Sequence, residues 1–496
     1  MVRRDRTRPV KDAREELSNS NEKANPNMSN GTEETPRAYS FNILRLGPVR
    51  AFARSRYVPL VFQILMLMIF GYAIYAAFIG FDDRGNNFGL LLFWSVFWPT
   101  FIMISLVLVG KMWCAICPLG ALSAAAQRFG LNRRFPAKLG GGIIALVIWI
   151  GVVWMAREIF DISSIGALTA WFFIGFVVAA VVVGLIFRQR SWCQHVCPIG
   201  IIAGLWSMLA FVELRPTREK CEACRSYECV RGSGSTQGCP MALHPGRLES
   251  NRDCTYCLNC VKACPYDSPQ IRLRIPGGEL VKGTRRLMVD AAFLLWVPVV
   301  LALKENMEHY NTPPFLISAT TWTQDLLGTS NRFGVWFFLV VVFNGLLLLG
   351  AYLLATRLAS RTLGWDYRRT FATFGYMFVP IVLVTIGGHS FRYFFEEIWG
   401  QMLSVSSAPL GVYAYHEQSA FSPAAIGFIG NDFLGPVLYA AGFLGTMALP
   451  YAIAFHRERD HRKALRAALP FFIIAAAIAG YFLWSHQAYS GGTWRW

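Results

Sequence analysis

The sequence has little charge for its length. Only 16% of its 496 residues are Asp, Glu, Lys or Arg, against about a quarter in soluble domains, while 54% are hydrophobic. This shortage excludes a simple soluble enzyme, and the apolar content excludes disorder over most of the chain. The net charge of +17 would fit nucleic acid, but basic loops on the cytoplasmic side of a membrane explain it better, so no nucleic-acid partner is expected.

Signals of export and of hydrolytic chemistry are also absent. No apolar core follows the first basic residues, so we expect no cleaved signal peptide. No nucleophile beside a base, phosphate-binding loop or carboxylate pair indicates hydrolysis. None of the 12 cysteines lies in a segment that we assign to the outside, which argues against a disulfide framework.

Long apolar runs are present instead, and runs of about 20 residues each span a bilayer. The sequence predicts nine such helices, at residues 58–80, 89–110, 139–156, 167–187, 287–303, 333–355, 370–388, 433–455 and 467–485. Three loops on one side, at 111–138, 356–369 and 456–466, carry fourteen Lys and Arg residues, against six in the five opposite segments. This bias predicts a multi-pass protein of the cytoplasmic membrane with its N-terminus in the cytoplasm and its C-terminus outside.

The pattern divides the chain into five segments. We expect a disordered cytoplasmic tail at 1–40, an interfacial amphipathic segment at 41–57 and a four-helix membrane region at 58–213. A polar module at 214–285 holds eight of the 12 cysteines, and a five-helix membrane region follows at 286–496. The predicted fold class is a mainly α polytopic membrane protein with an inserted cytoplasmic two-cluster ferredoxin-like module.

The strongest motif is the regular run Cys254-x2-Cys257-x2-Cys260-x3-Cys264-Pro265. Three thiolates at this spacing surround one [4Fe–4S] cluster, and the fourth, before Pro, reaches the neighbouring cluster in two-cluster ferredoxins. A structural zinc site is the alternative, although zinc normally takes two separated cysteine pairs.

An irregular run precedes it, Cys221-x2-Cys224-x4-Cys229-x9-Cys239-Pro240. It ends in Cys-Pro like the regular run, which predicts two [4Fe–4S] clusters with exchanged fourth ligands. One cluster then takes Cys221, Cys224, Cys229 and Cys264, and the other takes Cys254, Cys257, Cys260 and Cys239. One true cluster beside a zinc site at the irregular run is the alternative.

Two further cysteine pairs form an internal repeat, and we call them the membrane-edge pairs. Each follows an apolar hairpin and reads Trp-Cys…Cys-Pro-x-Gly, with cysteines at Cys114 and Cys117 and at Cys193 and Cys197. The two pairs could converge on a third cluster or another soft metal. Two buried structural pairs, or thiols that never meet, are the alternatives.

In combination these motifs resemble the membrane-bound polyferredoxins of the NapH, NosR and CcoG type, over about residues 58–285. The resemblance implies a membrane electron-transfer subunit, a quinol dehydrogenase or oxidoreductase component that passes electrons between quinone and partner redox subunits. For CcoG-like members it implies instead a metal-reducing assembly factor for a respiratory oxidase or reductase. The sequence departs from the family pattern, because Cys114-x2-Cys117 is one residue short and five helices follow the module.

Ionisable groups are rare in the C-terminal helices, so the exceptions are candidate sites. Asp290, one turn inside the fifth span, could take a quinol proton, and His389 and Glu396 could bind a quinone headgroup. Interfacial residues that are satisfied locally are the alternative. A b-type haem at His389 is less favoured, because no span carries a clear pair of facing histidines.

Overall fold

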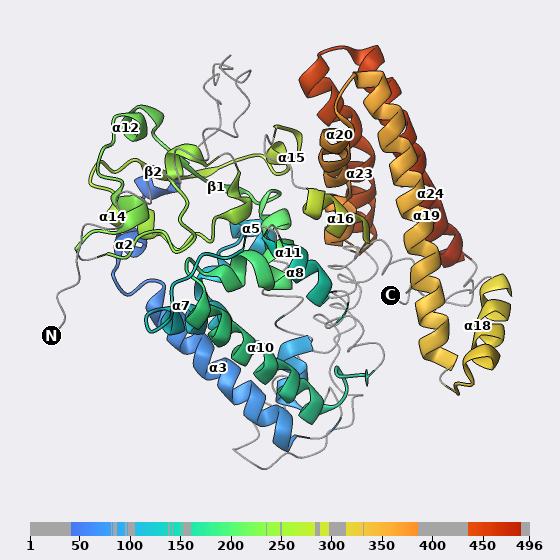
Figure 1. Ribbon diagram of the computed structural model, residues 1–496. Coiled ribbons are helices and arrows are strands. Elements are labelled where there is room, and N and C mark those ends of the chain that lie inside the picture. The colour runs from blue at the N-terminus through green and yellow to red at the C-terminus, as the bar shows by residue number, and fades with distance from the viewer. Residues whose placement is uncertain are drawn as a thin grey trace. The chain divides into compact units, whose positions relative to one another are not determined.

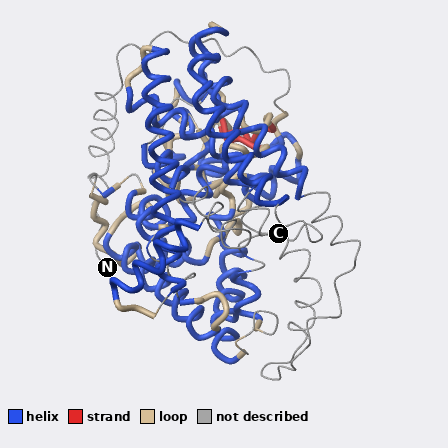
Figure 2. Tube along the Cα trace, turned by 90° about the vertical axis from the view of Figure 1, so that its right-hand side faces the viewer, coloured by secondary structure: helices blue, strands red, loops and turns tan. Residues whose placement is uncertain are grey.

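The computed structural model describes most of the chain (Figure 1). It covers residues 41–80, 82, 87–94, 97, 105–136, 139–140, 142–149, 151, 160–234, 236–248, 250–282, 288–296, 314–330, 332–384 and 435–487. The predicted disordered tail, His389 and Glu396 lie outside the described residues. Within them the chain is mostly helical, with one two-stranded sheet that is red in Figure 2.

Five described helices are long and apolar enough to cross a membrane. They cover Leu60–Ile79, Gly166–Ile186, Gly334–Leu363, Val437–Glu458 and His461–Tyr481. These helices match the first, fourth, sixth, eighth and ninth predicted spans, so a mainly α polytopic membrane protein is confirmed. The other four predicted spans run into residues outside the described ranges, and the total of nine stays a prediction.

The first membrane region is built on α3 (Leu60–Ile79), α7 (Pro118–Gln127) and α10 (Gly166–Ile186), which pack against one another (Figure 1). Gly184 permits the contact between α10 and α7, because a Cβ there would lie 2.3 Å from the Ser123 carbonyl oxygen. Shorter helical elements complete the region: α4 (Phe88–Leu90), α5 (Ser105–Val109), α6 (Trp113–Ile116), α8 (Ile143–Val147), the π-helical turn η7 (Trp192–Val196) and α11 (Pro198–Ser207).

The segment before the first span has two faces. It contains η2 (Ile43–Arg45) and α2 (Gly47–Arg54), and its Leu44 and Ala53 are buried in one core with the strands of the polar module. Leu46 and Phe52 are exposed, and Arg54 donates to Asp267 of the module at 2.7 Å. One face of this segment therefore packs on the polar module, and the other face is apolar and exposed.

The polar module folds around strands β1 (Val212–Pro216) and β2 (Pro269–Leu273). The strands are antiparallel, with Val212 opposite Leu273 and Pro216 opposite Pro269, so they bring the two ends of the module together. Between and after them lie α12 (Arg218–Glu222), α13 (Glu228–Arg231), η8 (Pro245–Arg247), η9 (Asn251–Asp253), α14 (Asn259–Ala263) and α15 (Gly278–Lys282).

The C-terminal helices form the rest of the described chain. They are α16 (Met288–Trp296), α18 (Pro314–Leu327), α19 (Arg332–Leu363), α20 (Tyr367–Phe374), η10 (Gly375–Phe378), α23 (Gly435–Glu458) and α24 (His461–Gln487). Helices α19, α23 and α24 pack together, with Phe471 and Ile453 fully buried (Figure 1). Helix α18 was not predicted, since its mixed composition reads as an external loop.

Candidate functional site

The two cysteine runs of the module share a local backbone geometry although their spacings differ. Helices α13 and α14 carry the third cysteine of each run, Cys229 and Cys260. Each helix follows a residue in the left-handed region, Tyr227 with φ 51° and Leu258 with φ 65°. Because non-glycine residues rarely adopt this conformation, its recurrence two residues before both cysteines marks a structural repeat.

The fourth cysteine of each run returns to the same place relative to the third. The amide of Cys264 donates to the Cys260 carbonyl at 3.2 Å, and the amide of Cys239 donates to the Cys229 carbonyl at 2.9 Å. The nine residues inserted between Cys229 and Cys239 therefore fold back on themselves. Gly232, with φ 89°, begins this return.

Hydrogen bonds to sulfur repeat as well. The amide of Leu243 donates to Cys239 Sγ at 3.4 Å, and the amide of Ser268 donates to Cys264 Sγ at 3.4 Å. The residue before each donor has φ 53° in both runs. Amide donors stabilise thiolate charge and are one of the determinants of the reduction potential of an iron–sulfur centre.

One cavity collects four of the module's thiols, and we call them the inner set. They are Cys239, Cys254, Cys257 and Cys260. Apolar side chains such as Leu243 line the rest of the cavity. The pKa of the Cys239 thiol is raised to about 11, first by burial and then by the neighbouring Cys257. Three of these thiols come from the regular run and one from the irregular run. The exchanged ligand scheme needs this grouping and stays a prediction.

The other four thiols form an outer set, of which Cys221, Cys224 and Cys264 are partly exposed. The pKa of the buried Cys229 thiol is raised to about 12, first by burial and then by Cys264, Cys221 and Cys224. Ser268 joins the two runs here, because its hydroxyl lies 3.1 Å from Cys221 Sγ while its amide donates to Cys264. Cys264 thus lies with the irregular run.

All twelve cysteines are free thiols. Among the residues that the structure describes, no three His, Cys, Asp or Glu side chains form a ready-made site for a single metal ion.

The two membrane-edge pairs come together at one place. Burial raises the pKa of the Cys197 thiol, and Cys193, Cys117 and Cys114 raise it further. Gly120 of the first motif permits this approach, because a Cβ there would lie 3.3 Å from Cys193 Sγ and 3.5 Å from the Cys114 carbonyl oxygen. The four thiols therefore act on one another electrostatically.

Two buried cations face these thiols. Arg190, 6% exposed, donates from Nη1 to the Cys114 carbonyl at 3.1 Å, and Lys111 is 3% exposed. Burial raises the pKa of the Cys193 thiol, while the positive charges of Arg190 and Lys111 oppose that rise. The sequence reasoning missed both cations, although each stands two residues before the Trp of its motif, and this symmetry was the available signal.

Residues that flank the membrane-edge pairs contact residues that flank the thiols of the inner set. Gln194, inside the second membrane-edge motif, donates from Nε2 to the carbonyl of Met241 at 3.2 Å, and Met241 follows Cys239 by two residues. Tyr256, inside the regular run, packs on Gly110 at the end of the second predicted span. A Cβ on Gly110 would lie 2.9 Å from Tyr256 Cε2, so glycine is required for this contact.

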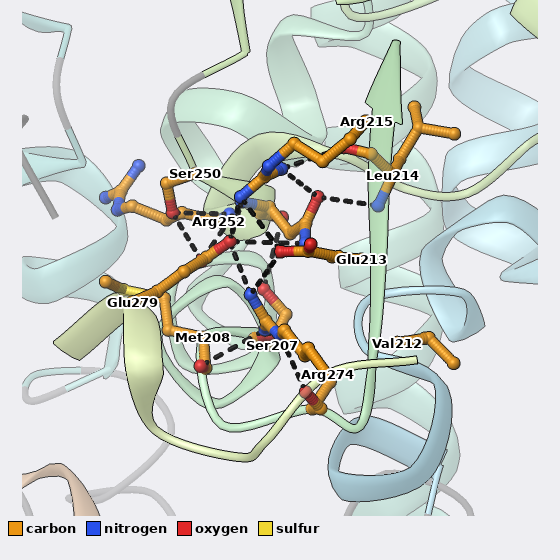
Figure 3. Close-up of polar contacts among 12 residues, drawn as sticks. Ser207, Met208, Val212, Glu213, Leu214, Arg215, Ser250, Arg252, Arg274 and Glu279 are labelled. Atoms are coloured by element: carbon orange, nitrogen blue, oxygen red, sulfur yellow. Dashed lines mark hydrogen bonds and ion pairs between the residues drawn. The ribbon is translucent and has the colours of Figure 1, made fainter. Parts of the chain in front are cut away.

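A buried charge network fastens the module to α11 (Figure 3). The Glu279 carboxylate accepts from Arg215 at 2.6 Å and from the Asn251 amide at 3.2 Å, and it lies 2.5 Å from Arg274 Nη1. Arg274 also donates to the carbonyl of Ser207, the last residue of α11, at 2.7 Å. The network thereby fixes the loop that leads into the regular run.

Asp290 is fully buried and has one hydrogen-bond partner in the polar module and another in the C-terminal helices. Its carboxylate accepts from Arg252 Nε at 2.7 Å and from the hydroxyl of Tyr376 at 2.5 Å. Its role as a quinone or proton site stays a prediction. The same holds for His389 and Glu396, which lie outside the described residues.

Apolar membrane helices followed by cysteine pairs, joined to a module whose eight thiols form two sets, resemble the arrangement of membrane-bound ferredoxin-type proteins. The comparisons with known proteins agree. A family described as a 4Fe-4S binding domain matches residues 90–136 and 169–213. Each matched stretch contains one membrane-edge pair, so the match falls on the repeat rather than on the polar module.

Several curated relatives match the chain in part. It is 27% identical to the putative electron transport protein YccM of Escherichia coli over 34% of its own length and 52% of that protein. It is 26% identical to the ferredoxin-type protein NapH of Haemophilus influenzae, over 33% of the chain and 62% of NapH. The regulatory protein NosR of Pseudomonas aeruginosa is 28% identical over 38% of the chain and 28% of NosR.

These matches confirm the resemblance to the NapH and NosR type. They cover about half of YccM and somewhat more of NapH, and about a third of this chain. No solved structure matches the chain significantly.

Proposed function

We propose that the chain relays electrons between quinone in the membrane and a partner redox protein at the cytoplasmic surface. The observation that carries this proposal is the order of the three thiol sets. The membrane-edge pairs contact the inner set through Gln194 and Met241, and the inner set shares its two cysteine runs with the partly exposed outer set. [4Fe–4S] clusters supply one-electron transfer, which suits a route between a two-electron quinol and one-electron partners.

The ligand assignment for the module follows its two sets. The inner set, Cys239, Cys254, Cys257 and Cys260, binds one [4Fe–4S] cluster, and the outer set, Cys221, Cys224, Cys229 and Cys264, binds the other. The amide donors at Leu243 and Ser268 support this assignment, since each stabilises negative charge on the Cys-Pro thiolate of one set.

The membrane-edge pairs bind a third cluster or metal centre. Lys111 and Arg190 support this assignment, because two buried cations beside four thiols offset the negative charge that the thiolates take on when they bind metal. The side chains of Trp113 and Trp192 are buried next to these pairs and exclude water from them. Quinone that diffuses in the bilayer can approach this end of the route, and a soluble or subunit partner docks at the outer set.

Quinol reduction tests the proposal. We expect a quinol analogue to reduce the iron–sulfur centres of the purified full-length protein in lipid nanodiscs, measured as bleaching of visible absorption. Cys193→Ser is expected to slow this reduction by tenfold or more, because it removes a ligand of the first centre on the route and interrupts electron transfer there. The same variant should retain about eight irons in the module and should still be reduced by dithionite, which serves as its control.

A different outcome of these experiments would favour the alternative function, a metal-reducing assembly factor. If the wild-type centres are inert to every quinol and quinone tried, while Cys114→Ser changes only the copper loading of an oxidase, the electron relay is wrong and metal reduction replaces it.

The proposed orientation has the N-terminus and the module in the cytoplasm and the C-terminus outside, as the Lys and Arg bias predicts. A reporter enzyme that is active only outside the cytoplasm, fused after Trp496, is therefore expected to be active. The same reporter inserted in the 356–369 loop is the matched control and should be inactive. An active loop fusion with an inactive C-terminal fusion would invert the orientation.

A further inference from the structure

A buried ion pair joins the regular cysteine run to the C-terminal helices. Arg252 lies two residues before Cys254, and its Nε donates to Oδ2 of Asp290 in α16 at 2.7 Å. Its Nη2 bonds to the other carboxylate oxygen, so the guanidinium engages both oxygens. Tyr376 of η10 donates its hydroxyl to Oδ2 at 2.5 Å. The carboxylate thus has one partner in the module and one in the C-terminal helices.

The surroundings hold this arrangement in place. The side chains of Asp290 and Arg252 are 0% and 15% exposed, and the third Arg252 nitrogen, Nη1, lies 2.6 Å from the more exposed Asp253. Gly375, directly before Tyr376, packs against Ala291, directly after Asp290. A Cβ on Gly375 would lie 2.4 Å from Ala291 Cβ, so the two segments touch along their backbones.

Attachment of the polar module to the C-terminal helices does not by itself explain why Arg252 and Asp290 form a buried ion pair. Burying an ion pair costs desolvation, and well-packed apolar residues of similar volume often replace such a pair without loss of stability. A fixed charge two residues from a cluster ligand has a second effect, because electrostatic interactions are screened little when they are buried. This pair adjoins the regular run, which supplies three of the four thiols of the inner set.

We propose that Arg252 and Asp290 are positioning residues that together set the reduction potential of the centre held by Cys239, Cys254, Cys257 and Cys260. Tyr376 lets the C-terminal helices act on that potential through the shared carboxylate. This inference rests on the proposed function, since it needs an iron–sulfur centre at the inner set. Arg252 favours the reduced form, which carries one more negative charge, and Asp290 opposes it.

The two partners therefore have opposite expected effects. Asp290→Asn leaves the guanidinium with only the more exposed Asp253 as counter-charge and is expected to raise the equilibrium constant for one-electron reduction about tenfold, or about 59 mV. Arg252→Gln removes the cation and is expected to lower the potential. The double variant should return close to wild type. The measurement is an EPR-monitored redox titration of the full-length protein, with iron and sulfide analysis of each variant.

Matched variants keep the test decisive where a substitution disturbs folding. Arg252→Lys keeps the charge and should keep the wild-type potential. Tyr376→Phe should lower the potential slightly, whereas Tyr352→Phe, which removes an equally buried hydroxyl bonded to the Phe371 carbonyl, should not move it. Shifts in the same direction for Asp290→Asn and Arg252→Gln, or no shift with iron retained, would overturn the inference. Absence of iron from the wild-type protein would instead overturn the proposed function.

Discussion

The double substitution Cys254→Ser and Cys257→Ser is expected to remove about four irons and four sulfides from the protein. Both thiols line the cavity of the inner set. Among the described residues, the other cysteines that line this cavity are Cys239 and Cys260. The outer set should keep its cluster, because its four thiols do not line that cavity, and two of them, Cys221 and Cys264, lie at Ser268 instead. Chemical analysis of iron and sulfide in the purified protein measures the loss.

A third substitution in that background tests the exchange of ligands. Cys264→Ser is expected to remove a further cluster's iron, about four atoms, or to degrade it to a three-iron form, since Cys264 belongs to the outer set. Cys239→Ser in the same background is the matched control and should change nothing, because its own cluster is already lost. If the two variants behave the other way round, each run holds its own cluster and the exchange is wrong.

Glu279→Ala is expected to destabilise the polar module by about 3–5 kcal/mol, because it leaves buried guanidinium groups without their main counter-charge. The side chains of Glu279 and Arg274 are 7% and 4% exposed, and the same carboxylate also accepts from Arg215 (Figure 3). Glu213 offers only partial compensation, at 3.8 Å from Arg274. The temperature at which the visible iron–sulfur absorption disappears should fall, and protease should cut the module more readily.

Glu219→Ala is the matched control for this prediction. Glu219 is an exposed glutamate of the same module, on α12, and surface carboxylates contribute little. Equal stability of the two variants would mean that the buried network does not fasten the module.

Motifs with a fixed local spacing were the predictable part of the molecule. The regular run determines its own loop, because three thiolates within seven residues can meet only around a compact centre. Five of the nine apolar spans were equally predictable, since length and hydropathy alone identify them. The membrane-edge pairs needed long-range geometry. The repeated Trp-Cys and Cys-Pro motifs showed that the two pairs correspond to each other, but not how far apart they lie in the fold.

Groups whose partners lie far away in the sequence were harder to predict. Asp290 reads as an isolated acid at a helix start, and nothing local indicates that Arg252 or Tyr376 will reach it. Arg190 and Lys111 read as ordinary basic residues of a cytoplasmic loop, yet both are buried against thiols. Burial of a charge depends on what folds over it, which a single sequence does not state.

The return of Cys239 to Cys229 through one backbone hydrogen bond uncouples the length of the intervening loop from the position of either ligand. Because loop-closure entropy grows slowly, doubling such a loop costs only about 0.6 kcal/mol. The segment is therefore a natural grafting point. A spectroscopic label or affinity peptide inserted there would stay attached to the module, and the positions of the two flanking thiols, Cys229 and Cys239, would not change.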